Sequence, residues 1–205
     1  MALVKQYGGV FQHILRTPET LVALGIMLVM NICRMINTNF WGILVTGRLQ
    51  VPEQYIAIFP FARAIIMLLF FFLIMPRIAH LDFKRPLMTG FLLFVSSQLI
   101  LISSPALGYA LLMLSIALEA FSLALIQPFM DALVVISVDA QERARIVSIL
   151  NVIMLTFTSP FGWLAGVSAE MDQRLPFLIN IGLLIVGIVL ISRAGGKKRD
   201  VTTAV

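Results

Sequence analysis

Long apolar segments, separated by short polar ones, dominate the hydrophobic pattern of this chain. Each apolar run is about twenty residues long, the length that an α-helix needs to cross the hydrocarbon core of a bilayer. A membrane β-barrel would instead show alternating segments of about ten residues. The pattern therefore predicts an all-α polytopic membrane protein with six transmembrane helices, at about 20–45, 52–75, 86–103, 106–135, 144–168 and 175–192.

Polar segments flank this predicted six-helix domain, which covers residues 20–192. Residues 1–19 are a mixed, partly basic segment without a small-residue cleavage site, so we expect an amphipathic lead-in on the membrane surface rather than a signal peptide. Thr17 and Pro18 suit the start of the first helix, as N-cap and first-turn residue. Residues 193–205 are expected to form a basic cytoplasmic tail.

Composition supports the membrane assignment, because 60% of the 205 residues are hydrophobic and only 12% are charged, far from the usage of soluble domains. Cys33 is the only cysteine, so we predict no disulfide framework, no cysteine metal site and no cofactor. The net charge of +5 comes from basic residues near the span ends. It indicates orientation in the bilayer rather than binding to nucleic acid.

The basic residues also predict which side of the membrane each loop faces. With the N-terminus in the cytoplasm, eleven of the fifteen Lys and Arg residues fall in cytoplasmic segments. Two, Arg48 and Arg174, fall in segments on the outer side, and the other two lie within spans. Cytoplasmic loops carry this excess in known membrane proteins. We therefore expect an integral multi-pass protein, with both termini cytoplasmic, in a bacterial plasma membrane.

Three charged residues fall deep inside the predicted spans, well away from the span ends: Arg34, Arg63 and Glu119. From the helical rise, Glu119 lies ~20 Å from the outer end of its span. Each arginine lies ~10 Å from the outer end of its own span. A charge in the hydrocarbon core costs at least ~2.5–3.5 kcal/mol, so each must face polar surroundings. We predict that all three reach one central polar layer.

Neighbouring polar residues extend this predicted layer. Asn31, Arg34 and Thr38 share one face of the first span, and Ser115, Glu119 and Ser122 share one face of the fourth. Such stripes are typical of a bundle interior or a water-filled cavity. The candidate solute and proton site comprises Arg34, Arg63, Glu119, Asn31, Asn37, Ser115 and Ser122.

Two arginines against one carboxylate favour a small anionic solute, because guanidinium groups hold carboxylates and phosphates bidentately. Glu119 can bind and release a proton, which predicts proton coupling. The alternative is a structural ion pair that fixes helix packing while nothing is transported. Asn37, Asn39, Asn151 and Asn180 are each interpreted first as interhelical hydrogen-bond partners and only second as ligands.

A GxxxG pattern formed by Gly162 and Gly166 lies in the fifth span and predicts close helix packing. Pro60, Pro128 and Pro160 fall inside spans, where proline bends helices and frees backbone carbonyl groups. These bends suit either a bundle that rocks or a set of static kinks.

Several of these segments together resemble the major facilitator superfamily of transporters. Residues 139–151 have an acidic turn, an arginine and then a helix with small residues, and they resemble that family's loop between its tenth and eleventh helices. Residues 159–166 are similar to its glycine-rich eleventh helix. Residues 77–85 resemble its basic loop between the eighth and ninth helices, although the glycines of that loop are missing here.

The resemblance covers about residues 17–192 and implies the second six-helix half of a twelve-helix transporter. It implies that the first, second, fourth and fifth spans line a central cavity and that the third and sixth face lipid. It also implies a second half, either a separate chain, a second copy or the rest of a longer protein. The cytoplasmic gating residues it implies are Asp82, Lys84, Arg85, Glu142 and Arg143.

The leading prediction is half of a secondary active transporter that moves a small solute by alternating access. A non-transporting six-helix scaffold, or a truncated transporter remnant, is the alternative. An intramembrane protease is disfavoured because His13 and His80 both lie outside the spans, so no serine–histidine pair lies within the bilayer. A channel is disfavoured because no repeated ring of charges or carbonyl groups is visible.

Overall fold

The computed structural model describes residues 18–78, 82, 84–106, 108–136 and 143–193, with only the backbone described for 18–20, 131–136 and 143–150. Within these ranges all regular structure is helical. The long helices are α2 (Pro18–Ile43), α3 (Ile58–Leu73), α5 (Lys84–Ser103), α6 (Tyr109–Ile136), α7 (Arg143–Met171) and α8 (Leu175–Arg193). Shorter elements are the π-helical turn η1 (Leu44–Arg48), the 3₁₀ turn η2 (Glu53–Tyr55) and α4 (Met75–Ile78).

Six helical segments in the described part are long and apolar enough to cross a membrane, which confirms the predicted number of spans. Most helix ends lie within three residues of the predicted bounds, whereas α3 begins at Ile58, six residues after the predicted start of the second span, because Glu53–Tyr55 forms a separate 3₁₀ turn. The chain is therefore described as an integral multi-pass membrane protein. The predicted lead-in at residues 1–17 and the tail at 194–205 lie outside the described residues.

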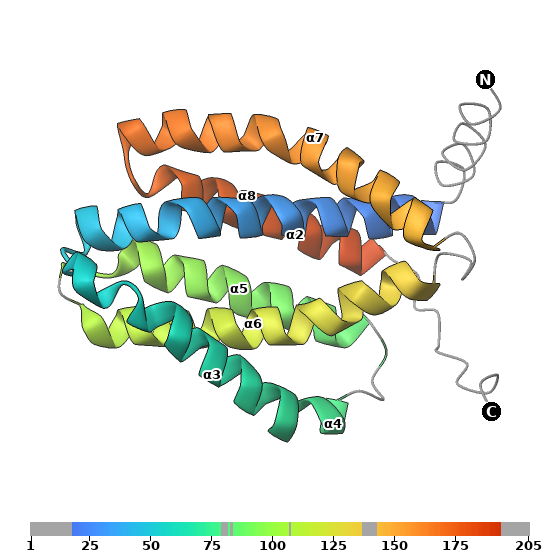
Figure 1. Cartoon of the computed structure of the whole chain (residues 1–205), viewed down its shortest axis with the longest axis horizontal. Coiled ribbons are helices and arrows are strands. Elements are labelled where there is room, and N and C mark those ends of the chain that lie inside the picture. The colour runs from blue at the N-terminus through green and yellow to red at the C-terminus, as the bar shows by residue number, and fades with distance from the viewer. Residues whose placement is uncertain (1–17, 79–81, 83, 107, 137–142, 194–205) are drawn as a thin grey trace.

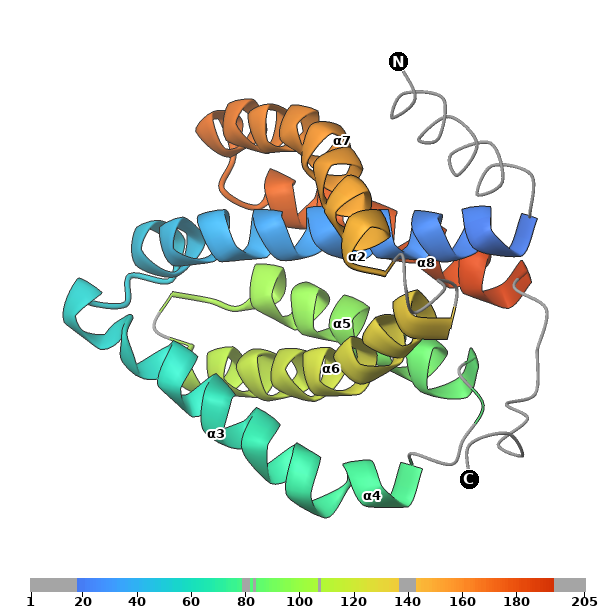
Figure 2. The same cartoon turned by 45° about the vertical axis from the view of Figure 1, so that its right-hand side comes forward.

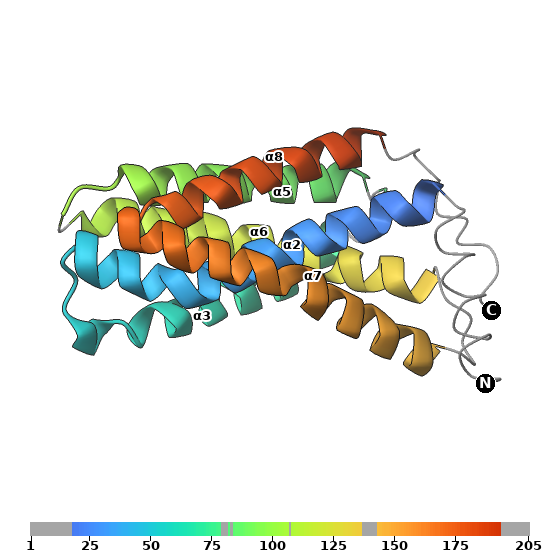
Figure 3. The same ribbon diagram turned by 90° about the horizontal axis from the view of Figure 1, so that it is seen from above.

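The helices lie roughly along one direction and form a bundle with two layers (Figure 1). Helix α5 packs against α6 and α8, α2 packs against α8 and α7, and α3 packs against α6. Seen from above, α5 and α8 lie on one side and α3 and α7 on the other (Figure 3). We call the side formed by α3, α6, α2 and α7 the front face, and the side formed by α5 and α8 the back layer.

Glycines permit close contacts of α5 with α6 and of α8 with α5. A Cβ added at Gly90 in α5 would lie 2.5 Å from Ile126 Cγ1 in α6, and one added at Gly187 in α8 would lie 2.4 Å from Phe91 Cε1 in α5. Only glycine leaves room for such approaches. These contacts surround an apolar core in which Phe91, Phe94 and Leu184 are fully buried.

Prolines shape the helices unequally. Pro128 lies inside α6 and Pro160 inside α7, and α7 bends about halfway along its length (Figure 2). Pro60 instead occupies the first turn of α3, where no intrahelical N–H bond is lost. Pro60 is therefore not expected to bend α3, contrary to the prediction from the sequence.

Candidate solute-binding site

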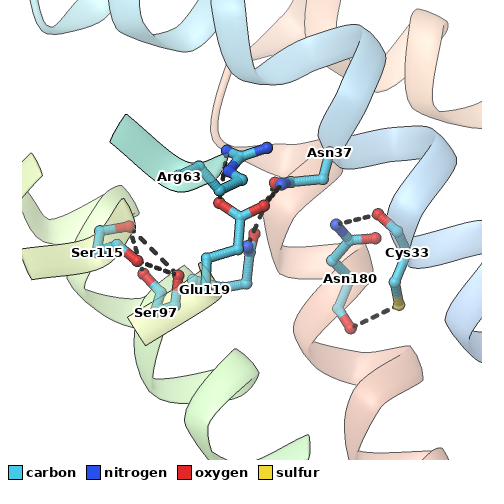
Figure 4. Close-up of polar contacts among 8 residues, drawn as sticks. Cys33, Asn37, Arg63, Ser97, Ser115, Glu119 and Asn180 are labelled. Carbon is cyan, nitrogen blue, oxygen red and sulfur yellow. Dashed lines mark hydrogen bonds and ion pairs between the residues drawn. The ribbon is translucent and has the colours of Figure 1, made fainter. Parts of the chain in front are cut away.

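Glu119 of α6 is the centre of a polar network in the bundle. The residue is only 1% exposed. Its Oε2 atom lies 2.8 Å from Arg63 Nη2 of α3, and its Oε1 atom accepts a hydrogen bond from the Asn37 amide of α2 (Figure 4). Both carboxylate oxygens are thus engaged by donors from two other helices, which stabilises the charged form in an apolar environment.

The network continues into the back layer through Gln98 of α5. Its Nε2 atom donates to Asn37 Oδ1 over 3.3 Å, so Asn37 accepts from one helix while it donates to another. Asn37 is 3% exposed and Gln98 is fully buried. One chain of contacts therefore joins α5, α2, α6 and α3, the last three of which form part of the front face.

Aromatic rings lie beside this network, at the end nearer the connection between α2 and α3. The Arg63 Cζ atom lies 5.8 Å from the centroid of the Trp41 ring, within the range of a cation–π contact. Trp41 in turn meets Phe59 edge to face, with ring centroids 5.4 Å apart. The arginine is therefore held between a carboxylate and an indole, while its side chain keeps 22% of its surface exposed.

A second polar bridge joins α2 and α6 further along the bundle. Arg34 Nη2 donates a hydrogen bond to the Gln127 side-chain oxygen. The structure thus decides which arginine pairs with Glu119: it is Arg63, whereas Arg34 contacts a neutral amide. Among the side chains that the structure describes, no carboxylate lies within ion-pair distance of Arg34.

Arg34 belongs to an exposed polar stripe at the middle of α2. Asn31, Arg34 and Thr38 are all exposed on the helix surface, as the spacing predicts for residues on one face. The stripe lies near the centre of the span 21–48, far from either end. A guanidinium at that depth is too costly to leave in lipid, so this part of the front face requires polar or aqueous surroundings.

Ser115 and Ser122 share a helix with Glu119 but are bound to α5. Ser115 and Ser97 each donate from the hydroxyl to the other's backbone carbonyl, over 3.1 and 2.9 Å. The Ser122 hydroxyl donates to the Gly90 carbonyl over 2.8 Å. The structure therefore brings Arg63, Asn37 and Glu119 together, whereas both serines connect α6 to α5.

The asparagines expected to join helices differ in their surroundings. Asn180 of α8 is fully buried and donates from Nδ2 to the Cys33 carbonyl of α2 over 3.3 Å, which confirms an interhelical contact. The Cys33 thiol lies 3.7 Å from the Asn180 carbonyl oxygen (Figure 4). Asn39 and Asn151 are exposed.

The residues expected to form cytoplasmic gating loops are only partly described. Glu142 lies outside the described residues, and the structure describes no side chain for Arg143. Asp82 and Arg85 are exposed. Lys84 donates to the Ser192 carbonyl over 2.7 Å and so connects the beginning of α5 with the end of α8.

Gly162 and Gly166 make no unusually close contact within this chain. A Cβ added at Gly166 would have no neighbour within 4 Å, and one added at Gly162 would meet only the Met35 side chain at an ordinary 3.5 Å. The close approach that GxxxG permits is made instead at Gly90 and Gly187. A role of Gly162 and Gly166 in packing against another chain stays a prediction.

Sequence reasoning missed Trp41, Gln98 and Gln127 as members of the network. Gln98 lies on a span expected to face lipid, and glutamine is rare enough in such a span that it was a usable signal. Trp41 is one helical turn beyond Asn37 on the same helix, which the spacing of four residues already indicates. Gln127 lies two turns from Glu119, and it accepts from Arg34, which lies on a helix distant in sequence.

Comparison with known proteins adds no relative: no family model, no curated protein and no solved structure matches this chain.

Proposed function

We propose that this chain is one half of a secondary active transporter, which moves a small anionic solute by alternating access with proton coupling. The observation that carries this proposal is that the two arginines inside the spans have different partners and different exposure. Arg63 is neutralised by a buried carboxylate, whereas Arg34 is exposed at mid-depth and contacts an amide. A packing ion pair accounts for the first arginine but gives no reason for the second.

A second six-helix half is the partner that this front face requires. The stripe of Asn31, Arg34 and Thr38 is exposed in the isolated chain, although it lies in the middle of a membrane span. A facing half would enclose it in a polar cavity and remove it from lipid. The resemblance of residues 17–192 to the second half of major facilitator transporters supports the same arrangement.

Competition for Arg63 supplies a mechanism of coupling. While Glu119 is ionised it pairs with Arg63, and its negative charge opposes the binding of an anionic solute at the same guanidinium. A proton on Glu119 weakens that ion pair and frees the guanidinium for the solute. Anion binding should therefore draw in a proton, and the affinity for an anion should rise as the pH falls. Arg34 adds positive charge nearby in both states.

The first test is the native mass of the chain after gentle extraction from its own membrane. A complex of about twice the chain's mass, either a homodimer or a pair with a similar-sized partner, is the expected result. A lone monomer would favour the scaffold or the transporter remnant, and would confine transport to a longer protein.

The second test measures proton uptake when succinate is added to the purified complex in weak buffer with a pH indicator. We expect succinate to draw in protons with the wild-type protein. The Glu119→Gln variant should bind succinate without proton uptake, because its amide does not ionise. Glu53→Gln is a matched control, since Glu53 is exposed in the η2 turn between α2 and α3. No binding of succinate, or unchanged proton uptake in Glu119→Gln, would contradict the proposal.

A further inference from the structure

Two buried N–H groups, one on Trp41 and one on Arg63, have no hydrogen-bond acceptor. Trp41 Nε1 and Arg63 Nε are both buried and make no hydrogen bond to any described protein atom. Trp41 as a whole is 6% exposed. A buried donor without an acceptor is costly, because it has lost its hydrogen bond to water, so two in adjacent side chains call for an explanation.

The two donors belong to side chains that stack on each other. The Arg63 Cζ atom lies 5.8 Å from the Trp41 ring centroid, so the two unpaired donors belong to side chains in direct contact. Phe59 also packs against the indole, edge to face. The Arg63 side chain keeps 22% of its surface exposed, although its Nε atom is buried.

The chemistry of these groups restricts what can bind there. Indole and guanidinium groups are donors only and offer no acceptor atom. Arg63 adds a positive charge. Glu119 accepts from only one of its nitrogen atoms, Nη2. A ligand that satisfies both free donors must supply acceptor atoms, and a negative charge on those atoms strengthens each hydrogen bond roughly two-fold.

We propose that Trp41 and Arg63 form a binding site for the carboxylate group of the solute, with the indole N–H as a specificity-determining donor. This inference rests on the proposed function and names the chemical group that the transporter recognises. Gln98, whose Oε1 atom is the acceptor left unpaired at the opposite end of the network, takes no part in this site.

The chain offers a direct optical test, because Trp41 and Trp163 are its only two tryptophans. Trp163 is 73% exposed on α7, so Trp163→Phe should leave the fold intact and make Trp41 the only indole. In this variant we expect succinate to change the Trp41 emission and to move the ¹⁵N–H resonance of its indole. Succinamide, which has the same length without charge, should do neither.

The Trp41→Phe variant tests the hydrogen bond itself, since it keeps a ring beside Arg63 and removes the N–H. Its affinity for succinate should fall about ten-fold, as expected for one hydrogen bond to a charged group. Unchanged affinity, or a silent Trp41 signal while succinate still triggers proton uptake, would overturn the inference and leave the proposed function standing. The absence of both binding and proton uptake would overturn the two together.

Discussion

At the residue scale, Asn37 is the side chain through which the polar network is connected. It donates to Glu119 and accepts from Gln98, so its removal leaves two buried groups with one partner fewer each. We predict that Asn37→Ala lowers the free energy of unfolding by about 1–3 kcal/mol. The measurement is thermal or denaturant unfolding of the purified chain in detergent.

Asn39→Ala is the matched control for this change, because Asn39 is an exposed asparagine on the same helix. A substitution at such a position should alter stability by no more than about 0.5 kcal/mol. Equal effects of the two substitutions would show that the network adds nothing to stability.

At the element scale, the contact of α5 with α6 depends on a glycine. We predict that Gly90→Ala destabilises the bundle by about 1–3 kcal/mol, because the new methyl group would lie 2.5 Å from Ile126 Cγ1. Gly166→Ala meets nothing within 4 Å and should leave the isolated chain unchanged or about 1 kcal/mol more stable, since alanine favours helix.

Unfolding of the two glycine variants under one set of conditions compares them directly. Greater damage from Gly166→Ala than from Gly90→Ala would mean that α7 packs more closely within the chain than α5 does. The order expected here is the reverse of what the GxxxG pattern alone predicts.

At the scale of the whole molecule, the distribution of basic residues predicts that η2 faces outward and α4 faces the cytoplasm. In a Cys33→Ala background, a cysteine at Gln54 should react with a membrane-impermeant maleimide in intact cells. A cysteine at Arg77 should react only after the membrane is opened. Both wild-type residues are exposed, so accessibility within the protein does not separate them. The opposite labelling pattern would invert the orientation.

The sequence by itself determined the membrane class, the number of spans and the presence of costly charges within them. Hydrophobic length and charge cost are local properties, and each can be read along a single helix. For the same reason the residues of one helix face, such as Asn31, Arg34 and Thr38, were identified correctly as a stripe.

Only the tertiary structure decided which residues meet across helices. Glu119 pairs with Arg63 rather than Arg34, Ser115 and Ser122 bind α5, and Gly90 rather than Gly166 makes a close contact. The sequence determines on which face of its own helix each side chain lies, and at which depth in the span. The rotation and tilt of neighbouring helices, which packing of the whole bundle sets, decide the partner.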